Sequence, residues 1–145
     1  MIEVAEKYTT IRDDFFSKPL YPLKDIRLMG SRCYDCGEVF LGEVAVCQQC
    51  QGNNMENLPL SRNGTLYSYT VARNRPPGDY KGFDNPFQPF PIGLVELPEG
   101  IRILSVLQCD INRLEIDMKL ELSIQKLYED DDGRIVLTYI FKPAI

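Results

Sequence analysis

The 145-residue chain contains no histidine and no tryptophan. Without histidine it lacks the commonest general base of enzymes, and every mixed cysteine–histidine metal site is excluded. The chain also has no paired-carboxylate or activated-nucleophile motif of the kind that enzymes use for acid–base or covalent catalysis. We therefore expect no catalytic residues in this chain, which makes a free-standing enzyme the least favoured class of function.

Long apolar runs and an excess of positive charge are also missing. No apolar stretch approaches the roughly 20 residues that a membrane-spanning helix needs, and the first ten residues lack the apolar run of a signal peptide. The formal net charge of -5 argues against a general nucleic-acid binder, because such proteins need clustered positive charge. Hydrophobic residues make up 44% of the chain, which is near the globular average, so we expect a folded cytoplasmic protein.

Four of the five cysteines form two Cys-x-x-Cys pairs, namely Cys33 with Cys36 and Cys47 with Cys50. Two intervening residues let a tight turn present both sulfurs to one ion, and Gly37 can adopt the left-handed conformation of such a turn. The pattern predicts a zinc ribbon with one structural zinc per chain, whose closed shell leaves no position for substrate. Iron is the alternative, but the second pair lacks the proline and glycine of a rubredoxin knuckle. Cys109 stands apart and is interpreted as a small packed side chain.

The first 60 residues are expected to form two small units. Residues 1–30 are predicted to be a helical arm, because the spacing of Ile11, Phe15 and Phe16 fits one face of a short helix. The arm packs either on the protein's own ribbon or barrel or on a partner, and the sequence leaves both possibilities open. Residues 31–60 hold the four cysteines and show little periodicity, so metal is expected to hold this ribbon together.

Residues 61–145 are predicted to form a barrel of five short antiparallel strands, with the OB-fold as the leading member of that class. Apolar and polar residues alternate here in five stretches bounded by turn signals. The expected strands are Thr65–Arg73, Pro91–Leu97, Ile101–Gln108, a stretch after Asp117 with Leu120, Leu122 and Ile124, and a stretch from Ile135 to Phe141. The first of them would place Tyr67, Tyr69 and Val71 on one face. The fold class is therefore mainly β.

The segment between the first two expected strands is the main functional candidate. It is longer than most loops without structure of their own, and its aromatic residues argue against disorder. The candidate binding residues are the cations Arg73, Arg75 and Lys81 and the aromatic residues Tyr80, Phe83 and Phe87. These residue types suit a phosphorylated cofactor or a protein interface. The alternative is a nucleic-acid-binding OB-fold, in which aromatic rings stack on bases.

Several motifs spread over the whole chain are shared with a known family. They are Phe15-Phe16, Cys33-Tyr34-Asp35-Cys36-Gly37 with Cys47 and Cys50, Gly64-Thr65-Leu66-Tyr67-Ser68-Tyr69-Thr70-Val71, Pro91-Ile92-Gly93-Leu94-Val95-Glu96-Leu97, and Phe141-Lys142-Pro143. On these motifs the chain resembles the thiolase-associated family once called domain of unknown function 35. In that family a rubredoxin-like zinc ribbon precedes an OB-fold.

The resemblance implies a non-catalytic accessory subunit that accompanies a thiolase-like catalytic subunit. Such a subunit would cover or complete the site for CoA or acyl-CoA, in a heterotetramer with two copies of each chain. The long loop would then supply cations for the phosphates of the CoA ester and aromatic residues for its apolar arm or for the interface. Among the family's members, the chain is similar to the small subunit of a β-oxoacyl-CoA thiolase of anaerobic aromatic degradation.

Overall fold

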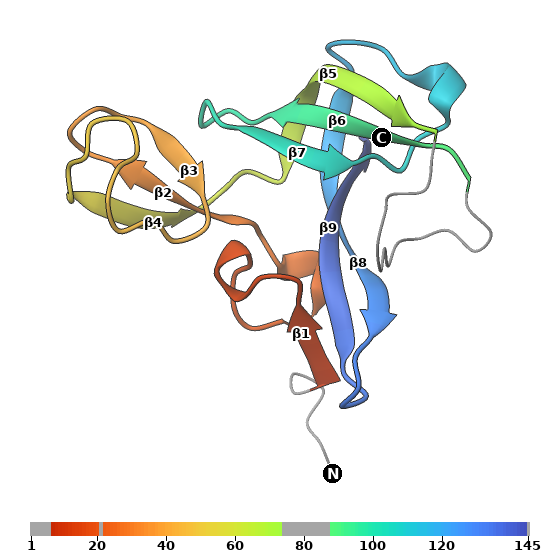
Figure 1. The fold of residues 1–145 in the computed structure, drawn as a ribbon. Helices are drawn as coiled ribbons and strands as arrows, with labels where there is room; N and C mark the ends of the chain where they lie inside the picture. Colours follow the sequence, from red (N-terminus) through yellow and green to blue (C-terminus); the bar gives the residue numbers. More distant parts are fainter. Residues whose placement is uncertain (1–6, 21, 74–87, 145) are drawn as a thin grey trace.

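The computed structural model describes residues 7–20, 22–73 and 88–144 and places them in two β-sheets (Figure 1). The strands are β1 (Tyr8–Thr10), β2 (Met29–Cys33), β3 (Val39–Leu41), β4 (Met55–Pro59), β5 (Asn63–Ala72), β6 (Phe90–Glu96), β7 (Arg102–Val106), β8 (Lys119–Glu129) and β9 (Ile135–Pro143). The larger sheet has the order β1-β9-β8-β5-β6-β7, and the smaller one has the order β3-β2-β4. The described helices are single 3-10 turns, η2 (Asp13–Phe15), η3 (Leu23–Asp25) and η4 (Ile111–Arg113), and none is long and apolar enough to cross a membrane.

Strands β5 to β9 form the predicted five-stranded barrel. Antiparallel pairs join β5 to β6, β6 to β7, β8 to β9 and β5 to β8, and a parallel bridge between Leu107 and Phe141 closes the barrel between β7 and β9. The five expected strands are therefore confirmed. The interior is tight at Gly93, where a Cβ would lie 2.8 Å from side-chain carbons of Leu66 and Leu107.

A β-bulge between Leu66 and Ser68 interrupts the alternation of β5. Because of the extra residue, Leu66 rather than Tyr67 shares a face with Tyr69. The expectation that Tyr67, Tyr69 and Val71 form one face is therefore wrong. A sequence pattern with a period of two cannot reveal where one residue is inserted into the ladder.

The predicted helical arm is wrong, since the described residues before β2 contain no α-helix. Strand β1 pairs in parallel with β9, and η2 and η3 follow as isolated turns. A short helix is costly to nucleate, whereas the backbone of Tyr8–Thr10 obtains hydrogen-bond partners on β9. Phe16 and Ile26 are buried in the same hydrophobic core as the barrel residues. The described part of the arm thus packs on the protein's own barrel.

Arg62 joins the arm to the barrel just after the ribbon ends. Its guanidinium donates one hydrogen bond to the carbonyl of Ile26 and another, of 3.2 Å, to the carbonyl of Leu122. Ile26 and Leu122 are 0% and 3% exposed, so water cannot readily replace the arginine at these carbonyl groups. Arg27 adds a neighbouring hydrogen bond from its Nε to the carbonyl of Leu60, at 2.9 Å.

We expect Arg62→Met to lower the free energy of unfolding by about 2 kcal/mol, because it leaves two buried carbonyl groups without a donor. Denaturation monitored by circular dichroism measures this change. Arg134→Met removes an exposed arginine from the turn between β8 and β9 and is expected to change the same quantity by less than about 0.5 kcal/mol. Equal losses in the two variants would contradict the structural role of Arg62.

Candidate functional site

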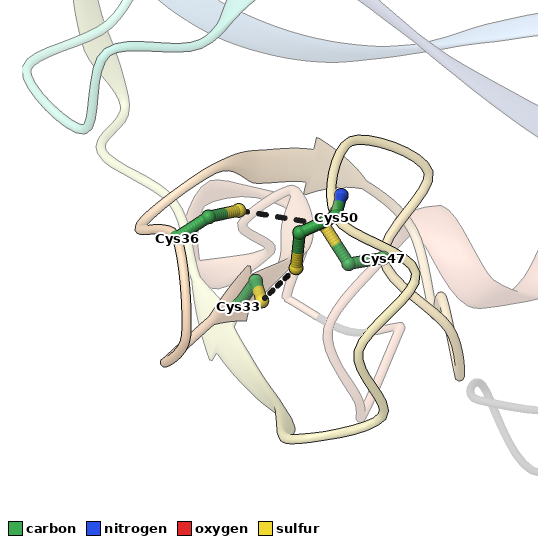
Figure 2. A group of neighbouring side chains, drawn as sticks. All are labelled: Cys33, Cys36, Cys47 and Cys50. Carbon is green, nitrogen blue, oxygen red and sulfur yellow. Dashed lines mark hydrogen bonds between the residues drawn. The ribbon is translucent and has the colours of Figure 1, made fainter.

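The four paired cysteines come together at one end of the ribbon (Figure 2). Cys33 ends β2 and Cys36 lies in the turn toward β3, while Cys47 and Cys50 lie in the loop between β3 and β4. All four Sγ atoms lie within 4.8 Å of one another. The structure therefore brings the predicted metal ligands into one cluster.

Two similar turns position the sulfurs. In the first, the backbone N–H of Gly37 donates to the carbonyl of Cys33 at 2.8 Å, and Gly37 has a φ of 81°. In the second, the backbone N–H of Gln51 donates to the carbonyl of Cys47 at 2.8 Å, and Gln51 has a φ of 63°. Gly37 thus plays its predicted part. Gln51 takes the same left-handed conformation without being glycine, a cost that the sequence alone does not indicate.

The distances between the sulfurs fit a four-coordinate metal ion. Sγ of Cys33 lies 3.6 Å from Sγ of Cys50, and Sγ of Cys36 lies 3.5 Å from Sγ of Cys47. A disulfide would require about 2.05 Å, and all four cysteines are free. A tetrahedron with metal–sulfur distances of about 2.3 Å has edges of about 3.8 Å. The cluster is therefore already close to the arrangement that a tetrahedral ion needs.

The thiols have very different tendencies to ionise. Burial raises the pKa of the Cys47 thiol, but the backbone N–H groups of Cys50 and Gln49 point at this sulfur and lower its pKa to about 7. The backbone N–H of Glu38 favours the thiolate of Cys36, yet desolvation and the neighbouring sulfurs raise its pKa to about 12. Four negative sulfurs this close repel one another, so a bound cation is needed to deprotonate them all. Metal binding should accordingly weaken as the pH falls.

Ser31 organises the ribbon, although the sequence analysis did not single it out. It is fully buried, and its Oγ donates to the carbonyl of Gly42 at 2.7 Å and accepts from the backbone N–H of Val44 at 3.0 Å. These bonds fix the start of the loop that leads to Cys47. A lone serine two residues before Cys33 carries no recognisable signal in a sequence without strong periodicity.

Asp14 of the arm holds the same loop from outside. Its carboxylate accepts a hydrogen bond of 3.0 Å from the backbone N–H of Glu43. Partial burial raises the pKa of Asp14, but the bond from Glu43 and the Arg12 guanidinium outweigh this and lower it overall. A Cβ at Gly42 would lie 2.7 Å from the Asp14 carboxylate, which leaves room only for glycine there. The arm and the ribbon therefore meet directly beside the metal-binding loop.

Cys109, which follows β7, and Arg73, which follows β5, are not part of the cysteine cluster. Burial, together with Asp110, raises the pKa of Cys109, which disfavours the nucleophilic thiolate. Arg73 is exposed and directly follows β5. The remaining candidate binding residues, Arg75, Tyr80, Lys81, Phe83 and Phe87, lie outside the described residues. Their role in binding remains a prediction.

We expect elemental analysis of the purified protein to give about one metal ion per chain, and Cys36→Ser or Cys50→Ser to abolish this binding and unfold the ribbon. The reason is that a ribbon with few large apolar residues gains its folding free energy from the metal. Cys109→Ser is the matched control and should keep the full metal content. A metal-free chain with the ribbon folded would contradict the assignment.

The chain is similar to several known proteins. Residues 58–125 match the family described as the C-terminal OB-fold domain of ChsH2. A "DUF35 domain-containing scaffold protein" of Methanothermobacter thermautotrophicus is 34% identical over 119 residues, which cover 80% of this chain and 86% of that protein. The benzoylsuccinyl-CoA thiolase subunit BbsA of Thauera aromatica is 30% identical over 115 residues, covering 79% of this chain and 75% of BbsA.

A solved structure agrees with these matches. The chain superimposes with a TM-score of 0.61 on a chain of the structure described as the "Ltp2-ChsH2(DUF35) aldolase", at 27% sequence identity. The match covers 82% of this chain and 86% of the other. The likeness therefore extends beyond the barrel to most of the chain.

Proposed function

The chain belongs to the DUF35 family, and from this membership we propose that it is a non-catalytic accessory subunit of a thiolase-type acyl-CoA enzyme complex. The proposal is supported by the names of its relatives, which are scaffold proteins and a thiolase subunit. BbsA is by name one subunit of a thiolase, and the description of the aldolase structure names Ltp2 beside ChsH2. In this proposal the partner subunit carries the residues that catalyse the acyl-CoA reaction, and the present chain contributes no catalytic residue.

The family match carries this proposal, and a second element of it is the cluster of four sulfurs on the ribbon. We propose that it holds zinc, because zinc is the usual ion of a closed shell of four cysteine thiolates in a ribbon. Such a shell has no open position for water or substrate, so the bound ion would supply folding free energy rather than reactivity. Free thiols in a metal-binding pattern fit a reducing compartment, and we place the complex in the cytoplasm.

For the long loop we propose a role in completing the CoA site of the partner. Arg73 stands exposed where the loop begins, and Arg75 and Lys81 add two more cations in the sequence. Charged groups of this kind bind the phosphates of CoA, while Tyr80, Phe83 and Phe87 suit its apolar arm or the subunit interface. We further propose two copies of each subunit and a β-oxoacyl-CoA substrate, for which benzoylsuccinyl-CoA is the candidate suggested by the BbsA relatives.

Co-expression with a thiolase-like protein encoded next to this chain tests the proposal. We expect the two proteins to co-purify on a tag carried by either one, and we expect thiolysis of a CoA ester only when the partner is present. The isolated chain should show no turnover, because it offers no activated nucleophile. Turnover by the isolated chain, or failure to co-purify from either tag, would refute an accessory role.

The loop is tested within that complex. Because charge-assisted hydrogen bonds contribute about 1.5 to 3 kcal/mol each, changing both Arg73 and Arg75 to alanine should raise KM for the CoA ester at least tenfold. Changing Phe83 and Phe87 to alanine should instead weaken subunit association. Arg134→Ala, in an exposed turn, is the control for lost positive charge. Unchanged KM and unchanged association in both loop variants would show that the loop is ordinary surface.

A further inference from the structure

Strands β5, β6 and β7 carry an apolar surface on the outside of the barrel. We call it the outer face and define it by two cross-strand rows, Ser68–Leu94–Leu104 and Thr70–Ile92–Val106. The alternate residues of the same strands, such as Val95 and Ile103, fill the core. An antiparallel sheet with one face on the core normally turns polar residues outward, but here β6 and β7 turn aliphatic residues outward. Leu104, on β7, is 62% exposed.

The charges beside the outer face neutralise each other. Among all residues of β5, β6 and β7, only Glu96 and Arg102 are charged. Nε of Arg102 lies 2.9 Å from the Glu96 carboxylate, and its guanidinium lies 3.7 Å from the centre of the Tyr67 ring, which the β5 bulge makes available. This polar cluster borders the row of Leu94 and Leu104. The outer face therefore offers no free cation to a phosphate or a nucleic acid, in contrast to surfaces that bind them.

A hollow continues the outer face at this polar end. It has a volume of about 300 Å³ and is lined by Thr65, Glu96, Leu97 and Lys119, among others. Thr65 and Glu96 are paired across β5 and β6 in the same row as Arg102, so the hollow and the outer face are continuous. Lys119 forms no ion pair with any residue in the described part of the chain. An entering carboxylate would therefore find a cation that is still available.

We propose that the outer face is the surface on which the catalytic subunit docks. This inference rests on the proposed function, which supplies the partner. The outer face has an apolar centre, the Glu96–Arg102 pair at its border and a hollow next to Lys119. The complementary surface of the partner would therefore be an apolar patch with an acidic side chain at its border. Two of these strands, β6 and β7, also correspond to the second and third strands of an OB-fold, which form its common ligand face. They lie on the side of the barrel away from β1 (Figure 1).

A second copy of this chain fits the outer face less well. Both copies would carry a formal net charge of -5, and the paired Glu96–Arg102 cluster offers no free charge to offset their repulsion. In such a dimer, Lys119 of one copy would need an unpaired acidic group on the other copy, but Glu96 of the outer face is already paired with Arg102. The complementary surface is therefore expected on a different protein.

The test compares Leu104→Arg with Ile116→Arg in the full chain, using binding to the purified thiolase-like subunit. Leu104 is 62% exposed and Ile116 is 53% exposed, so both variants should fold, which metal content and thermal melting verify. We expect Leu104→Arg to weaken binding about 100-fold, because it places a charge at the centre of an apolar interface. Ile116→Arg lies outside the outer face and should change Kd less than about threefold. Leu104→Gln, a milder change, is expected to weaken binding about tenfold.

The outcomes separate this inference from the proposed function. If the wild-type chain binds the partner and Leu104→Arg binds equally well, the docking surface is elsewhere and only this inference is overturned. If the wild-type chain does not bind the partner at all, both the docking surface and the proposed accessory function are refuted. If Leu104→Arg abolishes self-association in size-exclusion chromatography but leaves partner binding unchanged, the outer face contacts a second copy and the assignment to the catalytic subunit is overturned.

Discussion

The crowding of four cysteine sulfurs, whose thiolates would repel one another without a cation, is the constraint on which the ribbon depends. Between β2 and β4 the chain has few buried apolar side chains, and its turns place polar backbone groups around the cysteines. The surrounding hydrogen bonds prepare the site rather than replace the ion. Ser31 anchors the loop from inside and Asp14 from the arm, so the sulfurs are held near their bonding positions by groups that do not touch them. In such a site a metal ion would compete with protons for the cysteine sulfurs and would offset the repulsion between the four thiolates.

The arm and the barrel are held together by hydrophobic packing. One core cluster includes Phe16 and Ile26 of the arm and Leu66 and Phe141 of the barrel. Arg62 spans the same junction by bonding to carbonyl groups on both sides. The arm and the barrel therefore form a single packed unit, to which the ribbon is attached. The surfaces of the arm and the barrel are thereby held in a fixed relation to one another.

The barrel strands and the metal ligands were predictable because each rests on a short, local pattern. Alternation with a period of two marks β8, where Leu120, Leu122 and Ile124 alternate with polar residues, and the Cys-x-x-Cys spacing reflects the geometry of one turn. The arm was not predictable, because Tyr8–Thr10 obtains its partners from β9, at the opposite end of the chain. The bulge at Tyr67 and the left-handed Gln51 also escaped prediction, since neither leaves a compositional mark in the sequence. The outer face became visible only when the register aligned Leu94 with Leu104.

The pairing of β1 with β9 also bears on the order in which the molecule is built during translation. Strands β2, β3 and β4 lie close together in the sequence, so the ribbon can assemble soon after it leaves the ribosome. Residues 8–10, although made first, must wait for residues 135–137 before their ladder can form. Until then Phe16 lacks the ring of Tyr139, which lies 6.3 Å away in the finished molecule. The ladder between β1 and β9 can therefore form only late in synthesis, after β9 has been made.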